Sequence, residues 1–208
     1  MFTKEDLSRI DPRIPEDYDA KATEFWDYVG ARFSSLSGRL RKIYLESTGV
    51  MGKRHLELLR ISDPLQHGVV SSAVNSGAEV LEAEDPELVL ETLSWLQTMQ
   101  GLLAEGPRED DGDSAVKTIG EFLQESLSER DAAVRSTIDN TLKEGEVGAL
   151  IMDMSRGIEL PPNVRVVITC PFRPRDYLNS WLATLRAKDQ AKSTEGAPKA
   201  EEASGEKA

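Results

Sequence analysis

Large apolar residues recur at intervals of three and four along residues 119–142, and polar or charged residues fill the positions between them. This spacing predicts a long amphipathic helix with one buried face. The apolar stripe is interrupted at Arg130 and Asp131, and Gly145 follows it in a position that suits a left-handed helix cap. The stripe consists of Ile119, Phe122, Leu123, Leu127, Val134, Ile138 and Leu142.

Short apolar runs alternate with helical patterns along the chain, and we expect these runs to be strands. The run at 147–154 is almost wholly apolar and does not alternate, which is typical of a strand covered on both faces. Further strands are predicted at 41–46, 78–83 and 164–169. Strands separated by helices pair in parallel. The sequence therefore predicts the α/β class, with a small, mostly parallel sheet of about four strands flanked by helices.

Helical spacing and cap residues define the remaining elements. Pro12 and Pro15 interrupt residues 1–19, which we expect to be a loop. Asp85 followed by Pro86 is a typical helix start. Besides the long helix, we expect helices that begin near Asp17, Lys53, Leu65, Pro86 and Asp176.

One domain is expected over residues 1–188 of the 208-residue chain, a comfortable length for a single core. Residues 189–208 are Lys, Glu, Gln, Ala, Ser, Thr, Gly, Asp and Pro, with no large apolar side chain. Such a segment cannot bury enough surface to offset the entropy of ordering it. We therefore predict a disordered C-terminal tail.

The net charge of the chain indicates which kinds of binding partner to expect. The chain carries a net charge of −12, and its pI is about 4.7. An acidic surface repels nucleic acids and anionic lipids, so we expect neither nucleic-acid nor membrane binding. No apolar run reaches the length of a membrane helix, and the N-terminal residues do not resemble a signal segment. A single cysteine, Cys170, excludes an internal disulfide and favours a reducing compartment, the cytoplasm.

Common catalytic and metal-binding motifs are missing. His55 and His67 are the only histidines, and neither has the spacing of a zinc site, so we expect both at the surface. Cys170 has no histidine near it in the sequence and is expected to be a buried structural thiol. No nucleophile elbow, P-loop or dinucleotide fingerprint occurs.

Acidic residues follow several of the predicted strands. In a parallel sheet, Glu46, the pair Glu84-Asp85, and Asp153 lie at or near the carboxyl ends of three strands, where open α/β sheets bind ligands. Such carboxylates could hold Mg²⁺ or Mn²⁺.

Two arginines, Arg130 and Arg156, are candidates to bind an anionic substrate beside such a metal. A purely structural role for these acidic residues is the alternative to a metal site. In that case Asp85 caps a helix, Asp153 pairs with Arg156, and the two glutamates are solvated loop residues.

Several segments resemble, in order, a family of uncharacterised bacterial and archaeal proteins with the C-terminal pattern R-D-x-x-I-A-x-R-I-x-x-T-L-K-E-G-E-x-G-I-L-F-x-G-x-x-H, followed by L-P. The G-x-x-H element of that family is faintly similar to motifs of the TraB/Tiki-like hydrolases. The resemblance spans most of residues 20–170. It rests on Phe25-Trp26-Asp27-Tyr28-Val29, Gly77-Ala78, Glu84-Asp85-Pro86-Glu87-Leu88, Arg130-Asp131, Thr141-Leu142-Lys143-Glu144-Gly145-Glu146, Gly148 and Leu160-Pro161.

The departures from that family bear on function. Asp153 stands where the family has glycine, and Arg156 stands where it has histidine. The family also begins with a further strand that carries another histidine, and this chain is expected to start after it. The resemblance therefore implies a degenerate relative, a possible pseudoenzyme without a cofactor.

Two functions follow from these patterns. The first is a non-catalytic α/β protein that acts through contacts with a protein partner or as a homo-oligomer. The alternative is a carboxylate-dependent hydrolase that binds Mg²⁺ or Mn²⁺ at the carboxyl ends of the strands.

Overall fold

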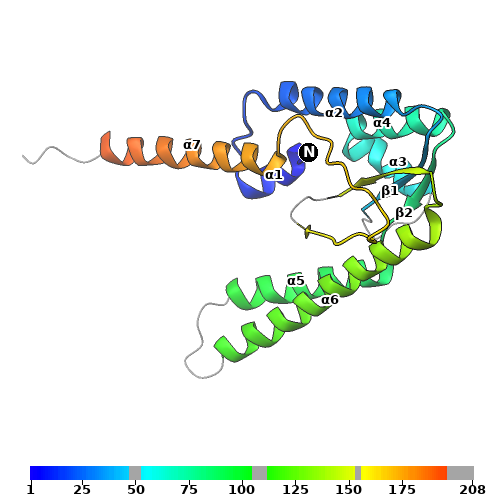
Figure 1. Ribbon diagram of the computed structural model, residues 1–208. Helices are drawn as coiled ribbons and strands as arrows, with labels where there is room; N and C mark the ends of the chain where they lie inside the picture. Colours follow the sequence, from blue (N-terminus) through cyan, green and yellow to red (C-terminus); the bar gives the residue numbers. More distant parts are fainter. Residues whose placement is uncertain (47–52, 105–111, 153–155, 196–208) are drawn as a thin grey trace, which may run out of the picture. The chain divides into compact units, whose positions relative to one another are not determined.

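A computed structural model describes residues 1–46, 53–104, 112–152 and 156–195 (Figure 1). The chain divides into two compact units. One, the terminal unit, combines Met1–Phe25 with Cys170–Ala208; the other, the sheet unit, is Trp26–Thr169. The sequence pattern predicted one domain over 1–188, whereas contacts group the two ends of the chain apart from its centre.

The sheet unit is built on three parallel strands: β1 (Leu40–Leu45), β2 (Glu79–Glu82) and β3 (Val147–Ile151). Their order is β2-β1-β3, and β1 pairs in parallel with both neighbours. Leu45, the last residue of β1, is in register with the last residues of β2 and β3. The predicted α/β class and the parallel pairing are confirmed.

The fourth predicted strand, at 164–169, is wrong: this described segment contains no strand. Val164 packs against the cluster around Tyr44, while Val166 to Ile168 are exposed. β-branched residues favour strands only where a neighbouring strand is available for pairing. The sequence shows that preference but does not show which strand would pair with this segment.

Both faces of the sheet are covered by helices. Ile43 and Leu45 pack on one face with Leu59 of α3 (Lys53–Ser62) and Val70 of α4 (Pro64–Asn75). Tyr44 points to the other face and packs with residues from the C-terminal part of α6 (Gly112–Thr141), namely Val134 and Ile138.

The α6 helix approaches the sheet closely at one point. Tyr44 shares a hydrogen bond of 2.9 Å with Thr141. A Cβ at Gly148 would lie 3.0 Å from the Tyr44 ring and 3.2 Å from Leu142. Glycine suits this position, because a Cβ there would require the side chain of Tyr44 or Leu142 to shift by a few tenths of an ångström.

Helix α5 (Pro86–Ala104) lies beside α6 as a hairpin (Figure 1). The two helices share a buried hydrogen bond of 2.7 Å between the hydroxyls of Thr92 and Ser126. Trp95 stacks on Phe122, with ring centroids 4.9 Å apart. Helix α2 (Tyr18–Ser35) was also predicted by its apolar spacing, and it runs from the terminal unit into the sheet unit.

The expectation that residues 1–19 form a loop is wrong, because α1 occupies Lys4–Ile10. Thr3 begins this helix with a capping box: its hydroxyl accepts the Asp6 N–H at 3.1 Å, and the Asp6 carboxylate accepts the Thr3 N–H at 2.9 Å. The fully buried Leu7 then packs against Trp181 of α7 (Pro174–Glu195). Both Pro12 and Pro15 follow the end of this helix and do not prevent it from forming.

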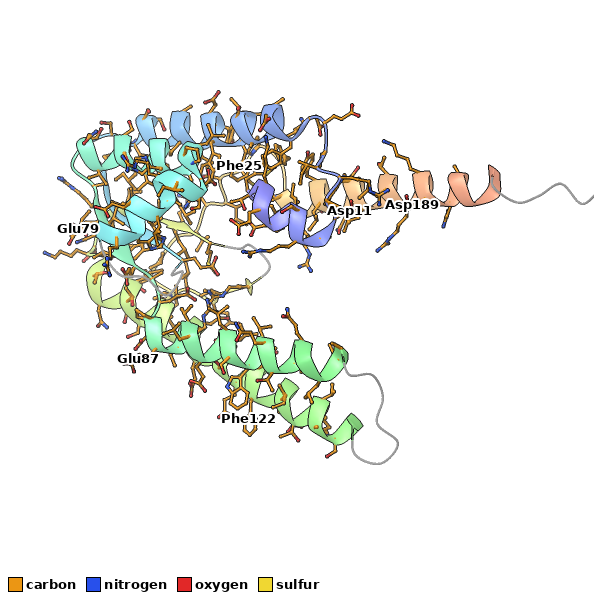
Figure 2. The ribbon with its side chains drawn as sticks, turned by 180° about the vertical axis from the view of Figure 1, so that it is seen from behind. Asp11, Phe25, Glu79, Glu87, Phe122 and Asp189 are labelled. Atoms are coloured by element: carbon orange, nitrogen blue, oxygen red, sulfur yellow. The ribbon has the colours of Figure 1, made fainter. Side chains whose placement is uncertain are left out.

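The predicted tail boundary at residue 189 is also wrong, because α7 continues to Glu195; residues 196–208 lie outside the described part of the chain. Ala, Lys, Gln and Glu are good helix formers and extend a helix whose first turns are packed. Arg13 binds Asp189 at 2.6 Å and Asp11 at 2.7 Å, and Figure 2 labels both acidic residues. Hydrogen bonds from Arg13 lower the pKa of Asp11 to about 2.

None of the described helices is both long and apolar enough to cross a membrane.

Candidate functional site

Glu46 and Glu84 meet at the carboxyl edge of the sheet. Glu46 directly follows β1, and its N–H donates to the carbonyl of Ile151 on β3 at 3.1 Å. On the other side the N–H of Ala83 donates to the carbonyl of Leu45 at 3.0 Å. Parallel pairing thus continues one step past each strand end and brings the two glutamates to the same edge.

Two arginines bind these glutamates. Arg156 follows β3 and donates to Glu46 Oε1 at 3.1 Å and, in a shorter contact, to Glu84 Oε1. Arg130, from the middle of α6, donates to Glu84 through Nε at 2.9 Å and reaches it through Nη2 at 2.8 Å. The candidate anion-binding arginines and two candidate metal ligands therefore lie in one cluster.

Asp131 completes the cluster, and the sequence did not predict its role. Its carboxylate accepts from Arg156 at 2.5 Å and 3.1 Å. The signal was the break in the apolar stripe of the long helix, where two charged residues occupy adjacent positions at the level of the strand ends. We call the five side chains Glu46, Glu84, Arg130, Asp131 and Arg156 the rim network.

The centre of the rim network is buried. The Glu84 side chain is 0% exposed, and the Arg130 and Arg156 side chains are 10% and 11% exposed. Burial opposes the charge of Arg156, but hydrogen bonds to Asp131 and Glu84 outweigh it and raise its pKa above the usual value. Charges that attract each other in such a low-dielectric setting interact far more strongly than they would in water.

The outer part of the rim network reaches solvent. The side chains of Glu46 and Asp131 are 31% and 36% exposed. Three carboxylates face two guanidiniums, so the five groups carry a formal net charge of −1. A guanidinium presents its N–H groups in a planar fork that suits carboxylates, and these contacts use oxygens that a metal ion would need.

Asp85 and Asp153 do not extend this described cluster. Asp85 is exposed, and its carboxylate accepts the N–H of Glu87 at 2.9 Å, where it caps the start of α5. Asp153 lies outside the described residues. Across the described ranges, no group of three or more histidine, cysteine, aspartate or glutamate side chains is placed to hold a metal ion.

His55 is buried, and the expectation that it lies at the surface is wrong. It is 5% exposed, and its Nδ1 has no hydrogen-bond partner among the described residues. Burial lowers the pKa of His55, and the nearby Glu82 offsets part of that shift. The sequence of α3 is largely polar, so the burial of this one ring was not predictable from its neighbours. His67, by contrast, is half-buried and bonds Ser71 at 3.1 Å.

A cavity of about 260 Å³ lies between α2 and α4 and is lined by small residues such as Gly30, Gly68 and Ser72. None of the charged residues of the rim network lines it.

No family model matches the chain, and neither does any curated protein or any solved structure.

Proposed function

We propose that this protein acts without catalysis, through contacts with protein, and that the rim network is a structural element of its sheet unit. The observation that carries the proposal is the position of Glu84. Its side chain is fully buried, and both Arg130 and Arg156 bind the same carboxylate oxygen.

The energetics of buried ion pairs support this role. Removing charged groups from water is costly, and only close contacts with additional hydrogen bonds offset the cost. The rim network has such contacts: Glu84 joins a helix, α6, to the segment after β3, and Arg156 joins Asp131 to the end of β1. Each strand end is thereby tied to α6, which fixes the helix across the sheet.

The location of exposed apolar residues supports the role in protein contacts. Large apolar side chains lie exposed on α5, among them Leu93 and Leu103, and along the segment at 166–168. Contiguous exposed apolar surface is typical of interaction sites. The half-buried Cys170 is compatible with a reducing environment, and we place the protein in the cytoplasm as a degenerate relative of the family that it resembles.

A metal titration followed by thermal unfolding tests the proposal. A ligand that binds only the folded state stabilises it by about 2.7 kcal/mol at a hundred times its dissociation constant. We expect Mg²⁺, Mn²⁺ and Zn²⁺ to leave the midpoint of thermal unfolding unchanged relative to a sample in EDTA. A rise with one of these metals that is lost in Glu46→Gln but kept in the exposed control Glu87→Gln would contradict the proposal.

The alternative function, a carboxylate-dependent metal hydrolase, is favoured by one observation. Glu46 and Glu84 converge at the carboxyl edge of a parallel sheet, where ligands bind in open α/β folds. In that case the partly exposed Glu46 would bind the metal, and Arg156 would turn to an anionic substrate. The titration separates the two functions, because only the hydrolase requires a metal-dependent rise.

A further inference from the structure

Helix α5 carries a second apolar seam besides the one that packs on α6. The inner seam includes Thr92 and Trp95, which contact Ser126 and Phe122. A second row begins one residue further along, turned by about 100° around the helix axis. We call this row the α5 seam; it consists of Leu93, Leu96, Gln100 and Leu103.

The α5 seam has the spacing of a coiled-coil interface. Its residues follow one another at intervals of three, four and three, which keeps them on one side of a helix and matches the spacing of interlocking side chains between two helices. All four are exposed, and Leu93, Leu96 and Leu103 are 43%, 38% and 64% accessible. The spacing therefore points to another helix as the occupant.

Charge favours a second copy of this chain. The stretch from Thr92 to Ala104 contains no charged residue, in a chain with a net charge of −12. Two acidic copies repel each other over most of their surface, and the α5 seam is a place where they can approach without opposing like charges. A charge-free seam also offers no specific attraction to a basic partner.

We propose that the α5 seam is a homodimer interface in which α5 packs antiparallel against α5 of a second copy. This proposal names the contact partner of the proposed function and rests on that function. Along the helix, the position midway between Leu93 and Leu103 is also midway between Leu96 and Gln100, and it lies at the level of Thr98. A two-fold axis at that level places Leu93 against Leu103 of the partner subunit and the reverse, as a self-complementary interface requires.

The antiparallel direction follows from the two acidic residues of α5. Glu87 and Glu91 both lie in the first half of the helix, and Figure 2 labels Glu87 near its start. A parallel pair would set these glutamates beside their own copies, whereas an antiparallel pair places them at opposite ends. Gln100, the polar residue within the seam, lies opposite Leu96 of the partner subunit in this register.

The area of the interface reaches that of a specific contact when α6 takes part beside the α5 seam. The 19 residues of α5 extend about 28 Å, and two adjacent helices are roughly 20 Å wide. Two such hairpins stacked face to face, with α6 of each copy included in the contact, cover roughly 1,100 Å² in total, at the low end of the range above roughly 1,000 Å² expected of a specific interface. The product is a four-helix bundle, a common arrangement of helical hairpins. Residues 196–208 contain no large apolar side chain and cannot cover the seam instead.

Sedimentation equilibrium of the full chain tests the proposal. The wild type should sediment with twice the 23.0 kDa mass of one chain. Leu93→Lys alone and Leu103→Glu alone should each weaken the dimer at least tenfold, since each puts an unpaired charge in the seam. The double variant, Leu93→Lys with Leu103→Glu, should recover the dimer, because each lysine then faces a glutamate of the partner subunit.

Ile61→Glu is the matched control, since Ile61 is a 76% exposed apolar residue on α3; it should remain dimeric. A monomeric wild type would overturn the dimer, as would a control that dissociates as readily as the seam variants. Failure of the double variant to recover would overturn the antiparallel register. If the wild type is monomeric and metals do not change its unfolding midpoint, the second copy is rejected as the partner and the non-catalytic function is retained. If a metal raises the unfolding midpoint, the non-catalytic function is rejected, whether the protein is a monomer or a dimer.

Discussion

At the carboxyl edge of the sheet, five charged side chains converge and three of them are almost fully buried, whereas on α5 three leucines of one seam are exposed. Both regions reverse the usual distribution, in which charge faces water and large apolar groups are inside. The rim network has internal partners for its charges, so it is complete within one chain. The leucines of the α5 seam have no equivalent cover among the described residues, and we propose that a second copy supplies it.

The two regions are therefore expected to differ in role: the rim network stabilises the fold of the chain, and the α5 seam is the proposed contact surface. Removing one partner from a buried ion cluster leaves the others charged and desolvated. Removing an exposed leucine changes the folded chain little. Substitutions should therefore have large effects on folding at the rim network and small ones at the α5 seam, where they should affect assembly.

The largest effect is expected for Glu84→Leu. It leaves the guanidiniums of Arg130 and Arg156 without their shared carboxylate, and breaking a buried ion pair in this way costs about 3–5 kcal/mol. The free energy of unfolding from urea titration measures the loss. Glu87→Gln, on the exposed start of α5, should change it by less than about 0.5 kcal/mol. If Glu84→Leu and Glu87→Gln lowered the free energy of unfolding equally, the rim network would contribute no more to stability than an exposed position on α5.

An intermediate effect is expected for Thr92→Val, on the inner side of α5. The buried Ser126 hydroxyl loses its partner at 2.7 Å, and an unsatisfied buried polar group costs about 1–3 kcal/mol. Thr98→Val is a matched control, because Thr98 is exposed on the same helix and bonds only its own helix backbone in the described structure. Urea unfolding should show a loss for Thr92→Val that exceeds the loss for Thr98→Val.

Acidification should destabilise the sheet unit through His55. Burial lowers the pKa of His55 in the folded state below its unfolded value of 6.5, so the unfolded chain binds the proton more readily. The contribution is therefore fully retained above 6.5 and is lost as the pH falls from that value toward the lower pKa of the folded state. Unfolding free energies at about pH 7.5 and about pH 5.5 should differ less in His55→Leu than in the wild type.

The smallest effect on folding is expected for Leu93→Lys. Its side chain is 43% exposed, so a dissociated chain carrying the substitution should unfold with a free energy within about 0.5 kcal/mol of the wild type at concentrations where both are monomeric. Circular dichroism during urea titration measures this value. A loss as large as that for Thr92→Val would mean that the seam packs against its own chain.

The sequence predicted much of the framework because local patterns determined it. The strands near 41–46, 78–83 and 147–154 were visible as apolar runs between helices, and parallel pairing then implied that Glu46 and Glu84 share an edge. Asp85 was recognisable as a helix cap, since its neighbour Pro86 suits the first position of a helix. These inferences needed only spacing and cap chemistry.

The remaining features depended on tertiary contacts. The segment at 164–169 has strand-forming residues but contains no strand, and Val166 to Ile168 lie exposed. Asp131 joined the rim network because α6 crosses the sheet at that turn, and a single charged position in a helix does not reveal what it faces. His55 was buried by packing around a helix that looks polar in isolation. The family resemblance stays a prediction.

A double-mutant cycle between Glu84 and Arg156 tests most directly whether the rim network is a closed structural unit. It compares urea unfolding of the wild type, Glu84→Gln, Arg156→Met and the double variant. A closed network predicts that the double variant loses less stability than the two single variants together, with a coupling of about 1–3 kcal/mol. Losses that add to within about 0.5 kcal/mol would mean that the two side chains do not act as a unit, and would contradict the account.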